Sequence, residues 1–455
     1  MNGWCRAFGP GATDQVARGK VMRVHFVSCC VGLACCLPMP GIYRTYGQDA
    51  LPGDVLYFVT DLGDLPGGYE CCYPLDINEL GQVTGRSCVD PSFEAFLWDP
   101  VDGMIGLGDL PGGAYQSEGE GVNNGGHVGG TSRGEIAYEA FLWTPETGMV
   151  GLGDLPGGTY YSEGHGINDH DQVVGFSRSD AGQEAFLWDP NDGMVGLGFL
   201  PGGGVSVAND INNATQVVGS SCSAERLEAF IWDPVNGMRG LGTMPGGHYG
   251  LDAYAINELG QVAGTASNSE AFLWDPVDGM IGLGVLPGRL PVAYGRGVNN
   301  LEQVVGWNLD LYTGANDAFI WDRAHGMRDL DDLLAAGDAE YAPLRYATGI
   351  NDAGQVIGKS LGAGGGILLD PFVVGDMNCD DVVDEDDIGA LLLILLDPEE
   401  YAQTYPDCPG EWAGDVNQDA VLDLHDLHAL RDFLGSAPSA QPGHYLPPEH
   451  ILPMP

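Results

Sequence analysis

Two short runs of acidic and amide side chains near the C-terminal end share one spacing. In each, Asp or Asn stands at the first, third, fifth, ninth and twelfth places of a twelve-residue segment. Calcium takes six to eight hard oxygen ligands, which such a loop supplies from these side chains and from the main-chain carbonyl at the seventh place. The sequence therefore predicts two Ca²⁺ sites, with the ligands Asp376, Asn378, Asp380, Val382, Asp384 and Asp387 in the first and Asp415, Asn417, Asp419, Val421, Asp423 and Asp426 in the second.

An apolar stretch of helical character follows each run, over residues 388–396 and 427–434. The duplicated loop and helix resembles the type I dockerin modules and covers about residues 376–435. The resemblance implies folding that depends on calcium and docking onto a cohesin-type partner in an extracellular or cell-surface assembly. The usual Gly at the sixth place is here Asp381 and Ala420. A left-handed backbone costs Ala on the order of 1 kcal/mol, so we expect the second site to be the weaker one.

Residues suited to catalysis form no comparable group. His165, His170, His248 and His325 stand outside the repeated pattern but belong to no recognisable Ser/His/Asp set or zinc-protease motif. Carboxylates are plentiful enough for the acidic pair of a glycosidase, yet most recur from repeat to repeat. We therefore favour a non-catalytic binding protein with no catalytic residues. The alternative is an enzyme acting on glycosyl bonds of polysaccharides, as a glycoside hydrolase or a polysaccharide lyase.

The elements that must position these residues come from a repeat of 42 to 47 residues, marked by Trp98, Trp143, Trp188, Trp232, Trp274 and Trp321. Each period has four short apolar pieces, as in MVGLGDLPGG, SEGHGIN, QVVGFS and EAFLW between residues 149 and 188. Each piece reads as a strand. The Asn of the second piece occurs seven times, as Asn78, Asn123, Asn168, Asn212, Asn257, Asn299 and Asn351. Seven repeats of four strands predict an all-β, seven-bladed β-propeller, which is followed by the small α-helical calcium module.

The pieces INxxGQVxG, AFLW and GLGxLPGG resemble the extracellular HAF-repeat family over about residues 55–371. That resemblance implies secretion and a repeat fold but no established reaction. The His of the family motif is replaced here by acidic residues. Equivalent positions on successive blades are related by rotation, so we expect these carboxylates to form a symmetric ring; they are Glu94, Glu139, Glu184, Glu228, Glu270 and Asp317.

Charge and leader indicate where the protein works. Lys and Arg number 17 and Asp and Glu 64, a net charge of −47, which excludes nucleic acid and anionic membranes as natural partners. Basic residues ahead of the apolar stretch 24–37 predict a secretory signal peptide. We expect a leader (1–50), a propeller (51–375), the calcium module (376–435) and a Pro-rich disordered tail (436–455). The protein is then extracellular, either free or attached to a cell surface, without membrane insertion after signal cleavage.

Six cysteines follow the leader, and an exported chain can oxidise them. We expect one disulfide between Cys379 and Cys408, and another from Cys88 to either Cys71 or Cys72, while the pairing of Cys222 stays open. The resulting hypothesis is a secreted scaffolding protein. Its propeller presents a ligand-binding surface, with carbohydrate as a candidate ligand, and its calcium module attaches it to a partner.

Overall fold

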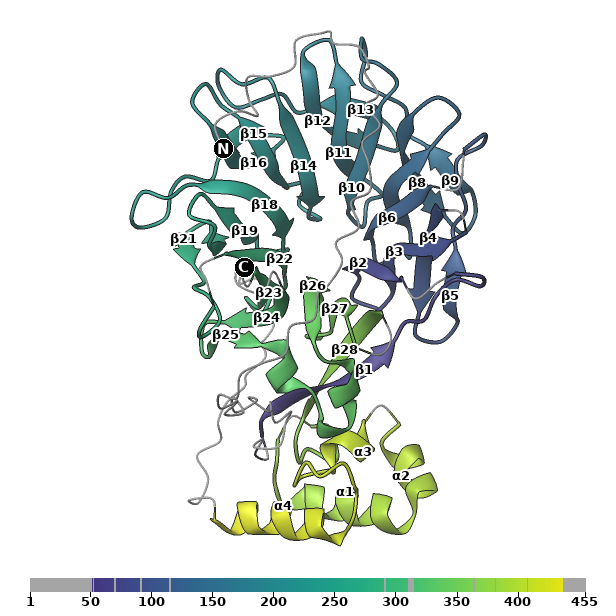
Figure 1. Ribbon diagram of the computed structural model, residues 1–455, viewed down its shortest axis with the longest axis vertical. Helices are drawn as coiled ribbons and strands as arrows, with labels where there is room; N and C mark the ends of the chain where they lie inside the picture. The colour runs from purple at the N-terminus through teal and green to yellow at the C-terminus, as the bar shows by residue number, and fades with distance from the viewer. Residues whose placement is uncertain are drawn as a thin grey trace, which may run out of the picture.

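The computed structural model describes residues 51–436 except 52, 69–70, 91, 114–115, 290–291, 310–314, 363–364, 381 and 407. The predicted leader and residues 437–455 of the predicted tail lie outside the described residues. The described chain forms seven four-stranded antiparallel sheets, set around a central channel, and a small helical region at the C-terminal end (Figure 1). The predicted seven-bladed propeller is confirmed.

Each blade has its first strand innermost. Blade one contains β2 (Tyr73–Ile77), β3 (Val83–Val89), β4 (Ser92–Asp99) and β5 (Gly103–Gly106). Blade two contains β6 (Ser117–Val122), β7 (Val128–Arg133), β8 (Tyr138–Thr144) and β9 (Gly148–Gly151). Blade three contains β10 (Ser162–Ile167), β11 (Val173–Ser179), β12 (Gly182–Asp189) and β13 (Gly193–Gly196). Blade four contains β14 (Ser206–Ile211), β15 (Val217–Cys222), β16 (Leu227–Asp233) and β17 (Gly237–Gly240). Blade five contains β18 (Gly250–Ile256), β19 (Val262–Ala266), β20 (Ala271–Asp275) and β21 (Gly279–Gly282). Blade six contains β22 (Ala293–Val298), β23 (Val304–Leu309), β24 (Asn316–Asp322) and β25 (Gly326–Asp329).

The seventh blade closes the ring with strands from both ends of the propeller. It contains β26 (Leu344–Ile350), β27 (Val356–Ser360), β28 (Gly366–Val373) and, on its outer side, β1 (Val55–Asp61). Val55 pairs with Val373 and Asp61 with Ile367. The sequence repeat is therefore offset by one strand from the blade, because the first strand of the first repeat belongs to the last blade. This exchange gives β28 a hydrogen-bonded neighbour on the outer side of the closing blade.

Apolar clusters join successive blades. The Phe of each AFLW-type piece is fully buried, and the repeat tryptophans pack against clusters that draw on two adjacent blades, as Trp143 does with Leu97 and Phe141.

Five of the six acidic residues of the repeat lie on the third strands of their blades, Glu270 directly precedes such a strand, and all six serve the fold. Glu94 Oε1 accepts a hydrogen bond from the Gly108 N–H (2.9 Å), and Glu139, Glu184 and Glu270 make the equivalent bond. Asp317 instead pairs with Arg289 (2.7 Å). The expected ring is thus a set of turn supports at equivalent positions, because each carboxylate is engaged by the glycine turn or by an arginine beside it.

The helical region contains α1 (Glu385–Leu396), α2 (Pro398–Thr404), α3 (Gly410–Ala413) and α4 (Leu424–Ser436). It packs on the closing blade, below the ring in Figure 1. One apolar cluster contains Leu56 of β1 and Phe372 of β28 together with Leu391 of α1 and Leu430 of α4. The Phe58 and Trp412 rings stack with centroids 6.1 Å apart and planes within 4°. The module and the closing blade therefore share a core across the expected boundary at residue 375.

Two disulfides join pairs of described cysteines, Cys379–Cys408 as expected and Cys71–Cys88 as one of the two expected alternatives. None of the helices in the described part of the chain has the length and apolar character needed to cross a bilayer.

Candidate functional site

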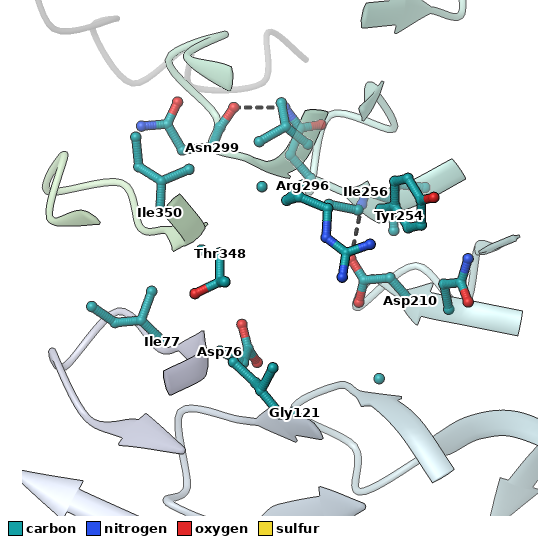
Figure 2. A pocket seen from close by; sticks show the side chains of 18 of the residues that line it. Asp76, Ile77, Gly121, Asp210, Tyr254, Ile256, Arg296, Asn299, Thr348 and Ile350 are labelled. Atoms are coloured by element: carbon teal, nitrogen blue, oxygen red, sulfur yellow. Dashed lines mark hydrogen bonds between the residues drawn. The ribbon is translucent and has the colours of Figure 1, made fainter. Parts of the chain in front are cut away.

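The central channel is lined by the innermost strands of all seven blades. They enclose a cavity of about 220 Å³, into which residues from β2, β6, β10, β14, β18, β22 and β26 contribute (Figure 2). This volume exceeds the about 150 Å³ of apolar cavities that accept a benzene-sized molecule. The two ends of the channel are built differently.

At one end, the repeated asparagines form a closed circle, which we call the asparagine ring. The side-chain Nδ2 of each Asn donates to the main-chain carbonyl of the equivalent Asn in the next blade, over distances of 2.8–3.1 Å, and Asn351 closes the circle on Asn78. The Oδ1 atoms accept from the following turn, as Asn212 does from the Gln216 N–H (3.0 Å). The Asn side chain thus bonds the turn of its own hairpin and also ties neighbouring blades together.

The next residue of every blade forms a second circle, the mouth ring. Each side-chain oxygen accepts the main-chain N–H of the equivalent residue in the preceding blade, over 2.7–3.1 Å. Burial and the neighbouring Asp352 carboxylate raise the pKa of Glu79. Burial alone would raise the pKa of Asp169, but hydrogen bonds from Asn124 and Asn213 lower it overall. The mouth ring comprises Glu79, Asn124, Asp169, Asn213, Glu258, Asn300 and Asp352.

Toward the other end, every innermost strand carries a β-bulge at the third residue before its Asn. Between Gly295 and Gly297, for example, the pairing of β22 with β23 skips Arg296, and the pairing of β2 with β3 skips Leu75 in the same way. A bulge re-aims the unpaired side chain. These residues, the bulge row, differ in all seven blades: Leu75, Glu120, His165, Asn209, Tyr254, Arg296 and Thr348.

Glycine on the second strand makes room for the bulge. A Cβ on Gly306 would lie 1.8 Å from the Tyr294 carbonyl oxygen, and one on Gly358 would lie 2.1 Å from that of Tyr346. The Gly of every QVxG piece stands at this close approach. The repeated residues thus build a scaffold that turns one non-repeated side chain per blade toward the channel.

A second non-repeated row, the rim row, lies two residues before the bulge row. It comprises Tyr73, Glu118, Glu163, Val207, Asp252, Tyr294 and Tyr346. Tyr294 stacks near Trp307 of β23 (5.5 Å between centroids), and Trp307 meets the Tyr346 ring edge-on (5.0 Å). Tyr346 approaches Tyr73 (6.2 Å). Blades six, seven and one therefore present a continuous, half-buried aromatic surface.

Blades two and three present acidic groups instead. Glu118 pairs with Arg86 (2.8 Å). Burial and the Glu118 carboxylate raise the pKa of Glu120 to about 7. Although burial opposes it, hydrogen bonds from His165 and Tyr161 lower the pKa of Glu163. The channel thus combines a carboxyl group that holds its proton near neutral pH with one that is ionised.

His165 lies between these carboxyl groups. Its Nδ1 is 2.7 Å from the Ala208 carbonyl, so Nδ1 carries a proton and Nε2 faces Glu163 at 4.0 Å. Burial opposes protonation, but the nearby Glu163 and Glu120 carboxylates raise the pKa of His165 overall. His170 and His248 are exposed, and exposed His325 pairs with Asp322. Of the four candidate histidines, the structure brings His165 alone into the channel.

Two aspartates lie deeper in the cavity. Asp76 Oδ2 accepts from the Val122 N–H (2.9 Å), and Asp210 Oδ2 accepts from the Ile256 N–H (2.8 Å; Figure 2). Burial raises the pKa of Asp76 to about 6 and that of Asp210 to about 8.

Sequence reasoning missed the channel site because the residues that line it lie in different repeats. The signal available was the variation three and five residues before each repeated Asn.

The two predicted calcium loops have matching backbone bonding. Asp387 accepts from the Met377 N–H (2.6 Å) and the Asp384 N–H (2.7 Å). Its counterpart Asp426 accepts from the Asn417 N–H (3.1 Å) and the Asp423 N–H (2.8 Å). The last acidic residue of each loop thus fastens the loop to the first turn of the helix that follows.

The other ligand positions also correspond. In the first loop, Asp380 N–H donates to Asp376 and Asn378, and Val382 N–H to Asp380. The second loop repeats this set with Asp419, Asp415, Asn417 and Val421. Among the described residues, no three acidic, histidine or cysteine side chains converge as a ready-made metal cluster.

The donor set nevertheless fits a hard divalent cation. Ala420 has the left-handed φ of 63° expected at the sixth place, and Cys379 and Gln418 share a positive φ at the fourth. Burial, and the charges of Asp426 and Asp419, raise the pKa of Asp415. Acidic oxygen donors that repel one another across a loop suit Ca²⁺. The sixth place of the first loop, Asp381, lies outside the described residues.

No protein-family model and no curated protein sequence matches the chain. Solved structures share the propeller fold at 10% identity. A catalytically inactive virginiamycin B lyase from Staphylococcus aureus aligns with TM-score 0.47 over 70% of this chain and 100% of that chain. An oligogalacturonate lyase from Vibrio parahaemolyticus aligns with TM-score 0.43 over 70% and 91%. TolB from Acinetobacter baumannii aligns with TM-score 0.36 over 62% of this chain and 63% of TolB. These likenesses concern the fold alone.

Proposed function

We propose that the protein is a secreted, non-catalytic binding protein that takes a saccharide at the bulge-row end of its channel. The observation that carries this function is the break in the repeat. Strands elsewhere in the blades are near copies, whereas the bulge and rim rows place Tyr, Glu, Asn and Arg side chains around one opening. Trp307 of the neighbouring strand β23 packs against Tyr294 and Tyr346 of the rim row. Aromatic faces receive the C–H faces of sugar rings, and a few convergent polar groups bind the hydroxyls.

Removal of the aromatic surface tests this proposal. Trp307→Ala should lower the affinity for a bound oligosaccharide about ten-fold, equivalent to about 1.4 kcal/mol, in calorimetric titrations that follow a glycan-array screen. Tyr160→Ala is the matched control, because Tyr160 is 73% exposed and lies outside the channel. Equal losses in both variants, or no glycan bound by the folded parent, would refute saccharide binding at this end.

We further propose that the C-terminal module binds two Ca²⁺ ions and attaches the protein to a cohesin-type extracellular or cell-surface partner. The matched bonding of the two loops and the crowding of their carboxyl groups support calcium, and the Cys379–Cys408 disulfide supports an oxidising compartment. The twelve predicted ligand residues would hold the ions, and a bound ion supplies the charge that offsets carboxylate repulsion.

Calcium titration of the full chain is the measurement. We expect two equivalents, and one for either Asp376→Ala or Asp415→Ala. Pull-down of a cohesin panel should require calcium. A stoichiometry of zero in the parent would remove the basis for the module, and calcium binding without capture of any cohesin would remove the partner.

One observation favours a second candidate function, a polysaccharide-degrading enzyme. Glu120, with a pKa raised to about 7, and ionised Glu163 stand in the same channel, an acid and a base of the kind that glycosidic bond cleavage uses. Incubation with polysaccharides should then yield new reducing ends, or unsaturated ends for a lyase. Glu163→Gln should abolish them, and intact polymer after incubation with the parent excludes this candidate.

A further inference from the structure

Arg296 stands out among the basic residues of this acidic protein. Most arginines of the described propeller pair with carboxylates, as Arg86 does with Glu118 (2.8 Å) and Arg289 with Asp317 (2.7 Å), while Arg178 lies over the Tyr161 ring. Arg296 forms no ion pair or hydrogen bond with another described residue. Its guanidinium carbon instead lies over the Tyr254 ring (4.2 Å) and the Trp307 ring (5.0 Å). Stacking holds the plane of the guanidinium and leaves its N–H edges available.

The side chain of Arg296 points into the cavity. Figure 2 shows its guanidinium directed into the open space between Thr348 and Asp210, and the bulge in β22 is what turns it there. A guanidinium edge presents parallel N–H donors that match the two oxygens of a carboxylate. An unpaired edge, fixed by two aromatic rings, indicates a ligand that brings such a group.

The surrounding acids suit a carboxylate once they hold their protons. Burial raises the pKa of Asp76, Glu120 and Asp210 to about 6, 7 and 8. A protonated carboxyl group donates a hydrogen bond and does not repel an anion. The titratable groups that line the cavity with Arg296 are Asp76, Glu79, Glu120, Asp210, Tyr254, Glu258 and Asp352, and Asp252 interacts electrostatically with Arg296. The neighbouring bulge and rim positions add Glu118, Glu163, His165, Tyr294 and Tyr346, with Arg86 beside Glu118 and Lys359 beside Tyr73.

We propose that the saccharide ligand is acidic, and that Arg296 binds the carboxylate of a uronate unit inside the channel. This inference rests on the proposed function and names the ligand class of the same site. The overall charge of −47 repels such a ligand at long range, so binding depends on the local donors around Arg296.

Proton uptake should accompany binding. A bound carboxylate favours the protonated forms of Asp76, Glu120 and Asp210, so affinity is highest below their folded pKa values and falls as pH rises through the range from about 6 to about 8. For each proton taken up, the affinity falls by up to about ten-fold per pH unit above the pKa.

The test compares an oligogalacturonate with the neutral galactose oligomer of equal length, by calorimetry on the full-length protein at about pH 5 and about pH 8. We expect the uronate to bind at least about ten-fold more tightly than the neutral sugar at the lower pH, and to weaken by at least about ten-fold at the higher pH. Glu120→Gln, which keeps a donor at all pH values, should retain more of the affinity at the higher pH.

Arg296→Gln should weaken uronate binding by about ten-fold more than it weakens binding of the neutral sugar, and Arg296→Lys should have an intermediate effect. Arg239→Gln is the control, because Arg239 lies on the outer strand β17. Thermal unfolding confirms that each variant is folded. Equal affinity for both sugars, or no selective loss of uronate binding in Arg296→Gln, would refute the proposal that the ligand is acidic. The proposal that the channel binds a saccharide would still stand. Absence of binding by both sugars, with no glycan bound in the wider array, contradicts the proposed function as well.

Discussion

The two ends of the channel are made from the same seven strands but follow opposite rules. At the asparagine ring, every blade has the same residue and makes the same hydrogen bond to its neighbour. A few residues earlier on each strand, the bulge row has seven different side chains. Whether a residue is repeated or variable therefore depends on its position along the strand and not on the blade to which it belongs.

The difference separates what holds the ring from what the ring can bind. A closed circle of identical bonds distributes its stabilisation evenly, so no blade can be altered without a loss. The bulge row contributes little to pairing, because its residues are skipped by the strand register. It is therefore the place where the chain can change chemistry without changing fold.

The largest expected effect comes from breaking the repeated end. Asn212→Ala removes donors to the Asn257 carbonyl and to Gln216 Oε1, and an acceptor for the Gln216 N–H, all buried or half-buried. We expect a loss of about 3 kcal/mol in the free energy of unfolding, measured by denaturant titration. Saccharide affinity of the folded protein should stay unchanged. If Asn212→Ala destabilises the protein less than Asn213→Ala, at the half-buried neighbouring position, the structural role is contradicted.

A smaller effect should appear in the cavity and depend on pH. Asp210 has a folded pKa of about 8 against about 3.9 for an unfolded aspartate. Because the folded value is raised, its contribution to stability is present at low pH and is lost as pH rises from about 4 to about 8.

Asp210→Asn keeps the acceptor for the Ile256 N–H and cannot ionise. It should stabilise the fold by on the order of 2 kcal/mol at about pH 8 and have little effect at about pH 4. Asp233→Asn is the control, since hydrogen bonds from Asn236 lower the pKa of Asp233 and predict the opposite sign. A pH-independent difference between parent and Asp210→Asn would show that the cavity is not a low-dielectric site.

The smallest effect should appear at the mouth ring. Glu79→Gln keeps an acceptor for the Asp352 N–H and removes the repulsion between the two carboxylates. We expect a gain of about 0.5 kcal/mol at neutral pH, and none where both groups are protonated, from thermal unfolding. Loss of saccharide affinity in this variant would move the binding site to the repeated end and break the comparison.

The sequence allowed the seven blades to be predicted, because Trp and Asn recur with a fixed period and each period has four strand-like pieces. The positive φ at Ala420 and the Cys379–Cys408 bond followed from local spacing. The channel site could not be read in this way, since its side chains come from seven repeats and only the bulge decides that they face inward. The repeat was enough to place Glu94 and Glu139 at equivalent positions on successive blades, but it could not show their partners, because main-chain N–H groups leave no mark in the sequence.

The pairing of β1 with β28 also orders the events of assembly. The first strand of the propeller to emerge during synthesis must wait for the last, and the helical module that covers both comes later still. Until then Leu56 and Phe58 have no core to enter, and the unfinished ring has unpaired edges at both ends, which are sites for wrong association. Formation of the seam is thus the slow, late and error-prone step of folding, and an assay that follows Trp412 burial would report it.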